Sequence, residues 1–153
     1  MSNILNTTTV YLAGRIDNNY LHRGYEWRQK VGAQLSQRAI LVRDPLRNVV
    51  TKNDGVIERV PDVNETFLVK RDLLDIEESD IVLVNYLDFA SMVGTLCEIG
   101  YAYANEKLIF GFNHPVDAAR NHMFMNTMVH HFDSWEHVLK AIISYDVKGY
   151  YVG

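Results

Sequence analysis

Residues Thr8-Thr9-Val10-Tyr11-Leu12-Ala13-Gly14 carry the signal that decides the fold. β-branched and apolar residues run without interruption up to Gly14, which is the pattern of a buried strand that leads straight into a turn. Similar apolar runs lie at residues 40–42, 81–84 and 108–112. Strands that are apolar at successive positions are buried on both faces, so these runs predict a mostly parallel sheet that is covered on both sides.

Segments with helical spacing separate these runs. Trp27, Val31 and Leu35 lie on one face of a helix that we predict over residues 20–37. Further helices are predicted over residues 64–78 (capped by Asn64 or Asp62), 94–105 and 118–128, and from Asp133, which Glu136 follows three residues later. A short strand is expected over residues 129–132 and a long loop over residues 46–63. This alternation predicts a three-layer α/β fold in one domain over residues 1–153.

Length and composition limit the class of protein. The chain has 153 residues, which favours one domain, and it is 48% hydrophobic and 22% charged, as in a globular protein. Lysine and arginine number 15 against 19 aspartate and glutamate residues, and no basic tract is interleaved with aromatic residues. We therefore do not expect a nucleic-acid polymer as the ligand, although single nucleotides remain possible.

The single cysteine, Cys97, excludes an intramolecular disulfide and metal sites built from paired cysteines. The amino terminus has no basic segment followed by an apolar one, and nowhere do about 18 apolar residues run together. We therefore expect a cytoplasmic protein without membrane contact.

Polar residues that follow the predicted strands are the first candidates for a site, because ligands of such sheets bind at the carboxyl ends of the strands. Gly14 and Arg15 follow the first strand, Asp44 follows the second, and Asp88 and Ser91 lie in the loop after the third.

Two further carboxylates fall inside predicted helices. Asp72 precedes the third strand, and Glu98 lies in the first or second turn of the next helix among Cys97, Ile99 and Gly100. These small or apolar neighbours suit a packed helix. Glu98 is therefore either a surface residue on the polar side of the helix or a buried functional one.

The ordered set of motifs along the chain resembles the nucleoside 2-deoxyribosyltransferase family. The matching pieces are Tyr11-Leu12-Ala13-Gly14-Arg15, Trp27-Arg28, Asp44-Pro45-Leu46-Arg47, Arg71-Asp72, Ser79-Asp80-Ile81-Val82-Leu83-Val84-Asn85 and Gly94-Thr95-Leu96-Cys97-Glu98-Ile99-Gly100. They span residues 10–112, and their order is more specific than any single piece. The resemblance implies a flavodoxin-like or Rossmann-like fold and exchange of the base of 2'-deoxynucleosides without a cofactor or metal.

The resemblance also assigns roles. Glu98 matches the nucleophile that forms a covalent deoxyribosyl intermediate, Asp72 the group that assists the base, and Tyr11 the tyrosine that orients the nucleophile. Breaking an N-glycosidic bond passes through an oxocarbenium-like state, which a carboxylate stabilises and then traps. A second carboxyl group supplies the proton that the leaving base needs.

Other matching positions are expected to bind substrate: Gly14, Arg15, Asp44, Asp88, Ser91 and Gly94. Asn121 and Met123 resemble an Asn-x-Met element that enters a neighbouring subunit's site and binds the 5'-hydroxyl of the sugar. The resemblance therefore implies a homo-oligomer with shared sites, whose partners are deoxynucleosides and free bases.

One departure leaves base preference open. The family's transferases carry an acidic residue six positions before the nucleophile, where this chain has Met92. A related activity, hydrolysis of deoxynucleoside 5'-monophosphates, is the close alternative, with Ser91, Arg15 and Arg23 as phosphate ligands.

Two more distant alternatives are a non-catalytic nucleotide-binding module and a metal enzyme. The first would not need both carboxylates. The second would use His114, His122, His130 and His131, but adjacent histidines point in divergent directions and lack a suitably spaced companion ligand.

Overall fold

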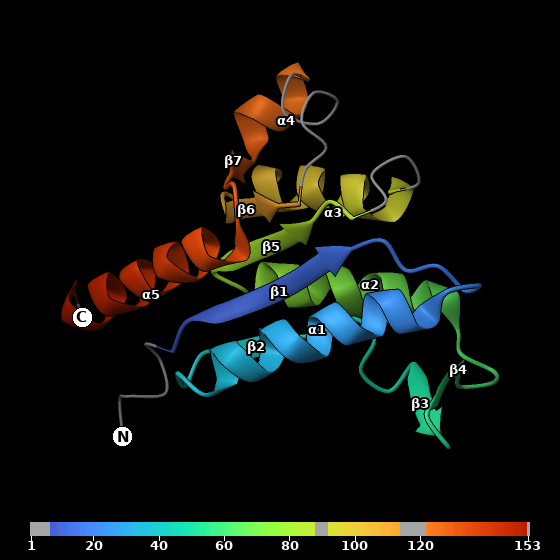
Figure 1. Ribbon diagram of the computed structural model, residues 1–153. Helices are drawn as coiled ribbons and strands as arrows, with labels where there is room; N and C mark the ends of the chain where they lie inside the picture. The colour runs from blue at the N-terminus through green and yellow to red at the C-terminus, as the bar shows by residue number, and fades with distance from the viewer. Residues whose placement is uncertain (1–6, 88–91, 114–121, 153) are drawn as a thin grey trace.

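The computed structural model describes residues 7–87, 92–113 and 122–152. Within these ranges helices and strands alternate along the chain, except that β2, β3 and β4 follow one another without a helix between them (Figure 1). The strands are β1 (Thr9–Gly14), β2 (Leu41–Arg43), β3 (Val50–Asn53), β4 (Val56–Arg59), β5 (Ile81–Asn85), β6 (Leu108–Phe112) and β7 (His130–His131). The helices are α1 (Leu21–Ser36), α2 (Glu65–Glu77), α3 (Val93–Ala104), α4 (Met123–Met128) and α5 (Trp135–Val152).

The main sheet has the strand order β2-β1-β5-β6-β7, and neighbouring strands are parallel. This is the flavodoxin-like order, in which the first strand lies between the second and the third. Tyr11 of β1 is in register with Val82 of β5 and with Arg43 of β2. The expected α/β fold with a mostly parallel sheet is confirmed.

Successive residues of β1 point to opposite faces of the sheet and so divide the core into two layers. Val10 and Leu12 pack in a cluster with residues of α1 and α5, whereas Tyr11 and Ala13 pack in a second cluster with residues of α2 and α3. Tyr11 is therefore directed toward the helix that carries Glu98.

The ends of two helices show how local hydrogen bonds fix their boundaries. Asn64, one of the two expected caps, accepts a hydrogen bond from the Phe67 amide and starts α2. Asp133, which was expected to open the last helix, lies one residue before the residue that caps it: Ser134 Oγ accepts from the His137 amide, and α5 begins at Trp135.

The expectation of a loop over residues 46–63 is wrong. Part of this segment forms an antiparallel hairpin, β3–β4, which projects from the body of the molecule (Figure 1). Asp54 and Gly55 both have positive φ angles, as a two-residue hairpin turn requires. An Asp-Gly pair is a turn signal in the sequence, but only Val50, Val56 and Ile57 among the residues of the two strands are strongly apolar.

Candidate active site

The connections from β1 and β5 run in opposite directions along the sheet, because β1 is followed by β2 on one side and β5 by β6 on the other. A crevice opens outside the strands at such a point. A pocket of about 400 Å³ lies there. It is lined by Gly14, Arg15 and Ile16 after β1, by Val69, Asp72 and Leu73 of α2, by Met92, and by Gly94, Thr95, Cys97 and Glu98 of α3.

A hydrogen bond joins Tyr11 to Glu98 at the base of this pocket. The Tyr11 side chain is fully buried, and its hydroxyl donates to Glu98 Oε2. Burial and the nearby Glu98 carboxylate raise the pKa of Tyr11, so the phenol keeps the proton that it donates. The tyrosine thus fixes one oxygen of the glutamate while the carboxyl group lines the pocket.

Glu98 and Asp72 face the same pocket from different helices, and both have raised pKa values. Burial raises the pKa of Glu98 to about 7; the charge of Asp72 adds to this effect, while the Tyr11 hydrogen bond and Arg28 oppose it. Burial also raises the pKa of Asp72 to about 6, against the lowering effect of Arg71. Between these values the pair holds roughly one proton, mainly on Glu98, whose pKa is the higher of the two.

Behind the pocket, a buried guanidinium holds the end of β1. Arg28 is 1% exposed, and it donates to the carbonyl oxygens of Gly14 at 2.9 Å and Gly24 at 3.0 Å. Its Nε lies 3.7 Å from Asp44 Oδ1. Gly14 also permits a close approach, since a Cβ there would lie 2.9 Å from Trp27 Cζ2. Arg28 therefore fixes the backbone where β1 leads into the pocket wall.

The structure brings together five of the residues that the sequence singled out. Glu98, Asp72, Gly14, Arg15 and Gly94 line the pocket. Tyr11 lies directly behind Glu98, and its hydroxyl donates a hydrogen bond to that carboxyl group.

Other expected binding residues lie elsewhere. Asp44 does not line this pocket; its carboxylate faces Arg28 and accepts from the Leu46 amide at 2.8 Å. Met123 begins α4, is 72% exposed and is not part of the pocket wall. Asp88, Ser91 and Asn121 lie outside the described residues.

A second hollow of about 220 Å³ lies on the other side of Asp72. Its walls are mainly apolar: Ile16, Leu21, Pro45, Leu46, Val49 and Leu68 contribute to them. Ile16 and Asp72 line both cavities, so the two are neighbours. Sequence reasoning did not select these apolar residues, because in the sequence they are indistinguishable from core residues.

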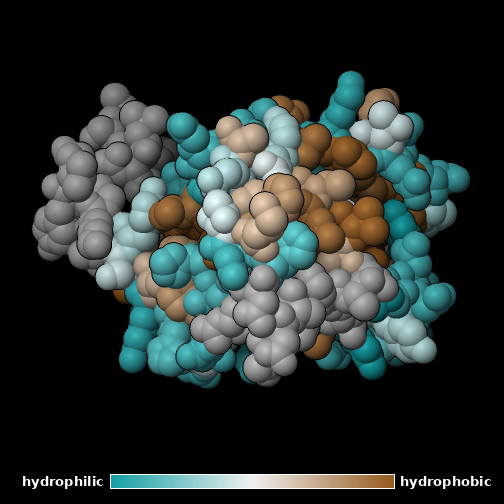
Figure 2. Space-filling view, turned by 90° about the horizontal axis from the view of Figure 1, so that it is seen from above, coloured by the Kyte–Doolittle hydropathy of each residue, from teal (hydrophilic) through white to brown (hydrophobic). Residues whose placement is uncertain are grey.

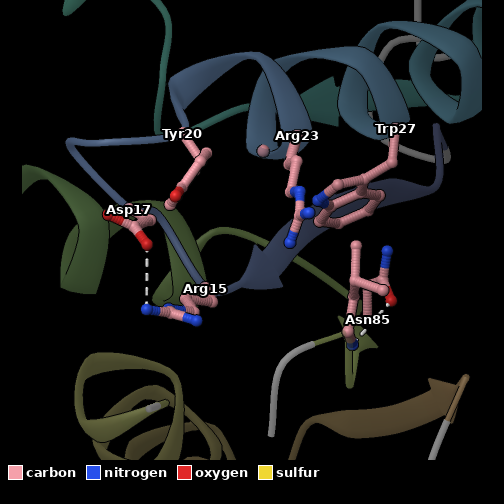
Figure 3. Close-up of a pocket in the computed structure, with 8 residues that line it drawn as sticks. Arg15, Asp17, Tyr20, Arg23, Trp27 and Asn85 are labelled. Atoms are coloured by element: carbon pink, nitrogen blue, oxygen red, sulfur yellow. Dashed lines mark hydrogen bonds and ion pairs between the residues drawn. The ribbon is translucent and has the colours of Figure 1, made fainter.

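A smaller depression lies beside the pocket, at the amino-terminal end of α1 (Figure 3). Arg15 and Arg23 both contribute to it, and Arg15 forms an ion pair with Asp17 at 2.9 Å. Its volume of about 10 Å³ leaves room for roughly one water molecule. Because Arg15 also lines the Glu98 pocket, this depression marks a basic rim of the site.

Two kinds of feature, a cluster of metal-binding side chains and a helix that could span a membrane, are not found in the part of the chain that the structure describes. Over residues 7–87, 92–113 and 122–152, no group of three or more His, Cys, Asp or Glu side chains is arranged to hold a metal ion. None of the helices in these ranges is long and apolar enough to cross a bilayer.

Comparisons with known proteins agree with the fold. The 2-deoxyribosyltransferase of Bacillus psychrosaccharolyticus has 22% identity and a TM-score of 0.62, over 86% of this chain and 90% of that chain. The 2-deoxyribosyltransferase of Leishmania mexicana has 18% identity and a TM-score of 0.65, over 92% and 97%. The CMP N-glycosidase of Clostridium botulinum has 17% identity and a TM-score of 0.53, over 92% and 99%. At these identities the likeness shows a shared fold.

A search of the curated proteins finds no significant match. The family model described as nucleoside 2-deoxyribosyltransferase, however, matches residues 10–135, which is most of the chain. The chain belongs to the nucleoside 2-deoxyribosyltransferase family.

Proposed function

We propose that this protein exchanges the base of 2'-deoxynucleosides through a covalent deoxyribosyl intermediate on Glu98. The observation that supports this proposal best is the arrangement of Tyr11, Glu98 and Asp72 at one pocket. One carboxyl group is held by a phenol, and a second lines the same cavity from another helix. Members of the family act on N-glycosidic bonds, which is the chemistry that two such carboxyl groups perform.

In the first step, a Glu98 carboxylate oxygen attacks the anomeric carbon of the sugar. The bond from that carbon to the base nitrogen breaks, and its electron pair leaves with the base. Asp72 gives its proton to the base as the bond breaks. The reactive form carries the proton on Asp72 and the negative charge on Glu98. The Tyr11 hydrogen bond and the Arg28 charge favour that form because they lower the pKa of Glu98, but burial keeps this pKa above that of Asp72, so the reactive form is the minor one of the two singly protonated forms.

In the second step, a nitrogen of the incoming base attacks the anomeric carbon and Glu98 leaves as the carboxylate. Asp72 takes the proton that the incoming base loses. Two successive displacements at one carbon restore the original anomeric configuration. The two bases and the two carboxyl groups account for every bond and proton in this exchange.

The apolar hollow next to Asp72 is the place that we propose for the base. A nucleobase is flat and largely apolar on its faces, and Ile16, Leu46 and Leu68 offer walls of that kind. Asp72 lies between this hollow and the Glu98 pocket, so a proton on its carboxyl group is within reach of a base that leaves the sugar.

Hydrolysis of a deoxynucleoside 5'-monophosphate is the second candidate function. The observation that favours it is the basic rim of the site, where Arg15 and Arg23 contribute to one depression. Guanidinium groups bind phosphate oxygens well. The depression itself has room for little more than a water molecule, which makes it a weaker argument than the paired carboxyl groups.

One set of incubations separates these functions. Purified protein is mixed with deoxyuridine or deoxyinosine, and separately with the matching 5'-monophosphates, each with and without free adenine. Deoxyadenosine that forms only when adenine is present supports the transferase. Free base released from the monophosphates with or without adenine supports the hydrolase, and no product in any mixture favours a binding module.

The exposed apolar residues of α3 and α4 support a further proposal, that the protein is a homo-oligomer. Val93 and Met123 are 76% and 72% exposed, and Phe124 is also exposed. The face seen in Figure 2 shows apolar side chains gathered beside polar ones. Large apolar patches on a protein surface mark contacts with partners.

A further inference from the structure

Arg71 of α2 joins the loop after β2 to the Asp72 carboxylate. Its Nη1 donates to the Arg47 carbonyl at 2.9 Å, and its Nη2 donates to the Pro45 carbonyl at 2.6 Å. The same Nη2 lies 3.4 Å from Asp72 Oδ1. One guanidinium thus contacts two backbone oxygens of the loop and the carboxylate of the adjacent residue.

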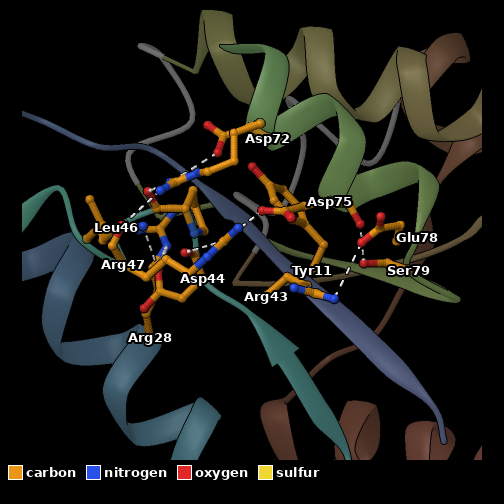
Figure 4. A network of polar contacts seen from close by, with 12 residues as sticks. Tyr11, Arg28, Arg43, Asp44, Leu46, Arg47, Asp72, Asp75, Glu78 and Ser79 are labelled. Carbon is orange, nitrogen blue, oxygen red and sulfur yellow. Dashed lines mark hydrogen bonds and ion pairs between the residues drawn. The ribbon is translucent and has the colours of Figure 1, made fainter. Parts of the chain in front are cut away.

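The loop that Arg71 holds is itself well fixed (Figure 4). Asp44 Oδ1 accepts from the Leu46 amide at 2.8 Å, which closes a tight turn. Arg47 Nη1 lies 2.6 Å from Asp75 Oδ2, one turn of α2 beyond Arg71. Arg47 and Arg71 therefore tie the loop to α2, and Pro45 and Leu46 in it form part of the wall of the apolar hollow.

The cost of this arrangement argues for more than a structural tie. Among the described residues, the buried Nε of Arg71 has no hydrogen-bond partner. A buried polar atom without a partner is unfavourable. An apolar side chain would avoid that cost, but it would leave the Pro45 and Arg47 carbonyl oxygens without this donor, and it would supply no positive charge beside Asp72.

We propose that Arg71 is a positioning residue, which fixes Asp72 relative to the loop wall of the hollow and keeps a positive charge next to its carboxylate. This inference rests on the proposed function, since it assumes that Asp72 moves a proton to and from the base. Arg71 acts through Asp72 and through the loop.

The charges around Asp72 set the direction of the expected effect. The groups that interact with it are Arg71 and Asp75 of α2, Arg47 of the loop, Glu98 of α3, Tyr11 of β1 and Arg28 of α1. After the raising effect of burial, Arg71 has the largest influence, and it lowers the pKa of Asp72. Loss of the cation therefore raises the pKa of Asp72, while a lysine at this position keeps a charge but cannot form the same fork.

The test titrates the Asp72 carboxyl carbon by NMR in the wild type, Arg71→Met and Arg71→Lys. The matched control is Arg43→Met, because Arg43 also lies 3.4 Å from a carboxylate oxygen, that of Glu78, at the surface away from the pocket. We expect the Asp72 titration to move to higher pH in Arg71→Met and to stay closer to the wild-type pH in Arg71→Lys. Arg43→Met leaves it unchanged.

Steady-state kinetics then separate the effect of the Arg71 charge from the effect of its hydrogen bonds to the loop. In Arg71→Lys we expect the pH optimum to remain near that of the wild type while KM rises roughly tenfold, since two hydrogen bonds to the loop are lost. In Arg71→Met, KM rises similarly and the optimum also moves to higher pH. Circular dichroism checks that each variant is folded.

An Asp72 titration that is the same in folded Arg71→Met as in the wild type would overturn the inference, as would an equal shift in Arg43→Met. The NMR titration needs no turnover. If the protein shows no base exchange, the proposed function fails, but the titration still decides whether Arg71 controls Asp72.

Discussion

Tyr11 is a polar residue in a position where an apolar side chain is the usual choice, and its partner is Glu98. Tyr11 lies in the central part of a fully buried strand, whereas Glu98 is half-buried in α3, next to the fully buried Ile99. Burying a hydroxyl or a carboxylate without a partner is costly, and these two groups satisfy each other. The pair is therefore a specific feature of the site, and each residue loses its partner if the other is replaced.

Tyr11→Phe tests this pair. The variant removes the hydrogen bond that lowers the pKa of Glu98, so that pKa rises further above the pKa of Asp72. The alkaline limb of the activity profile, which follows the more basic of the two carboxyl groups, therefore moves to higher pH, and less of the protein carries its negative charge on Glu98. Loss of a hydrogen bond to a charged group is expected to lower kcat/KM by roughly 10- to 150-fold. The measurement is the pH profile of kcat/KM for each protein.

Tyr101→Phe is the matched control, since the Tyr101 hydroxyl donates to Glu77 at the surface. It should behave as the wild type. Activity in Tyr11→Phe that matches the wild type at every pH would show that the phenol does not orient Glu98.

Activity should show a bell-shaped dependence on pH, which follows from the two raised pKa values. Below about pH 6 both carboxyl groups are protonated and Glu98 cannot attack, whereas above about pH 7 both are ionised and no proton is available for the base. The optimum of kcat/KM is therefore expected between these values. A rate that keeps rising well above pH 7 would mean that no carboxylic acid takes part.

At the level of the elements, β6 packs closely against two side chains: Tyr86, which follows β5, and Val129, which precedes β7. Gly111 of β6 lies under the Tyr86 ring and against Val129. A Cβ at Gly111 would lie 2.5 Å from Tyr86 Cε2 and 2.9 Å from Val129 Cγ1. Tyr86 in turn contacts Met125 of α4 and His131 of β7 through its hydroxyl, so one buried ring joins these elements.

Gly111→Ala should lower the free energy of unfolding by about 1–3 kcal/mol, because the buried ring has to move. Gly100→Ala in α3 is the opposite case: nothing lies within 4 Å of the added methyl group, and alanine is the better helix former. It should raise stability by about 0.5–1 kcal/mol. Urea denaturation measures both, and equal midpoints for Gly111→Ala and the wild type would contradict the packing described.

The elements also show what can be read from the sequence. Uninterrupted apolar runs such as residues 81–84 identify central parallel strands, and Asn64 identifies the start of α2 by the chemistry of its side chain. The β3–β4 hairpin was missed because exposed strands away from the core carry little apolar pattern. Hydrophobic periodicity reflects burial, so it gives no signal for an element that is not buried.

The features of the site also fall into those that the sequence identifies and those that it does not. Tyr11, Asp72 and Glu98 were selected through the family resemblance, and the structure brings their side chains to one pocket. Asp44 was expected to bind substrate but faces Arg28, since its position after a strand does not determine which way its carboxylate points. The contacts of Arg71 with loop carbonyls could not be predicted, because backbone oxygens leave no mark in the sequence.

At the scale of the whole molecule, the exposed apolar surface of α3 and α4 predicts self-association. Val93→Asp places a charge on this surface and should lower the mass measured by sedimentation velocity relative to the wild type. Val56→Asp is the control, because Val56 is 55% exposed at the hairpin tip, away from α3 and α4. A wild-type protein that sediments as a monomer would contradict the proposed oligomer.

The central claim is that Glu98 becomes covalently attached to the sugar. The most direct test is to incubate the protein with a 2'-deoxynucleoside that carries fluorine at the 2' carbon, which slows breakdown of the intermediate by destabilising positive charge at the anomeric carbon, and to measure the mass of the protein and its peptides. The account predicts release of the free base and a sugar adduct on the peptide that contains Glu98, with no adduct in Glu98→Gln and an unchanged one in Glu77→Gln. Release of base without any adduct, or an adduct that persists in Glu98→Gln, would contradict it.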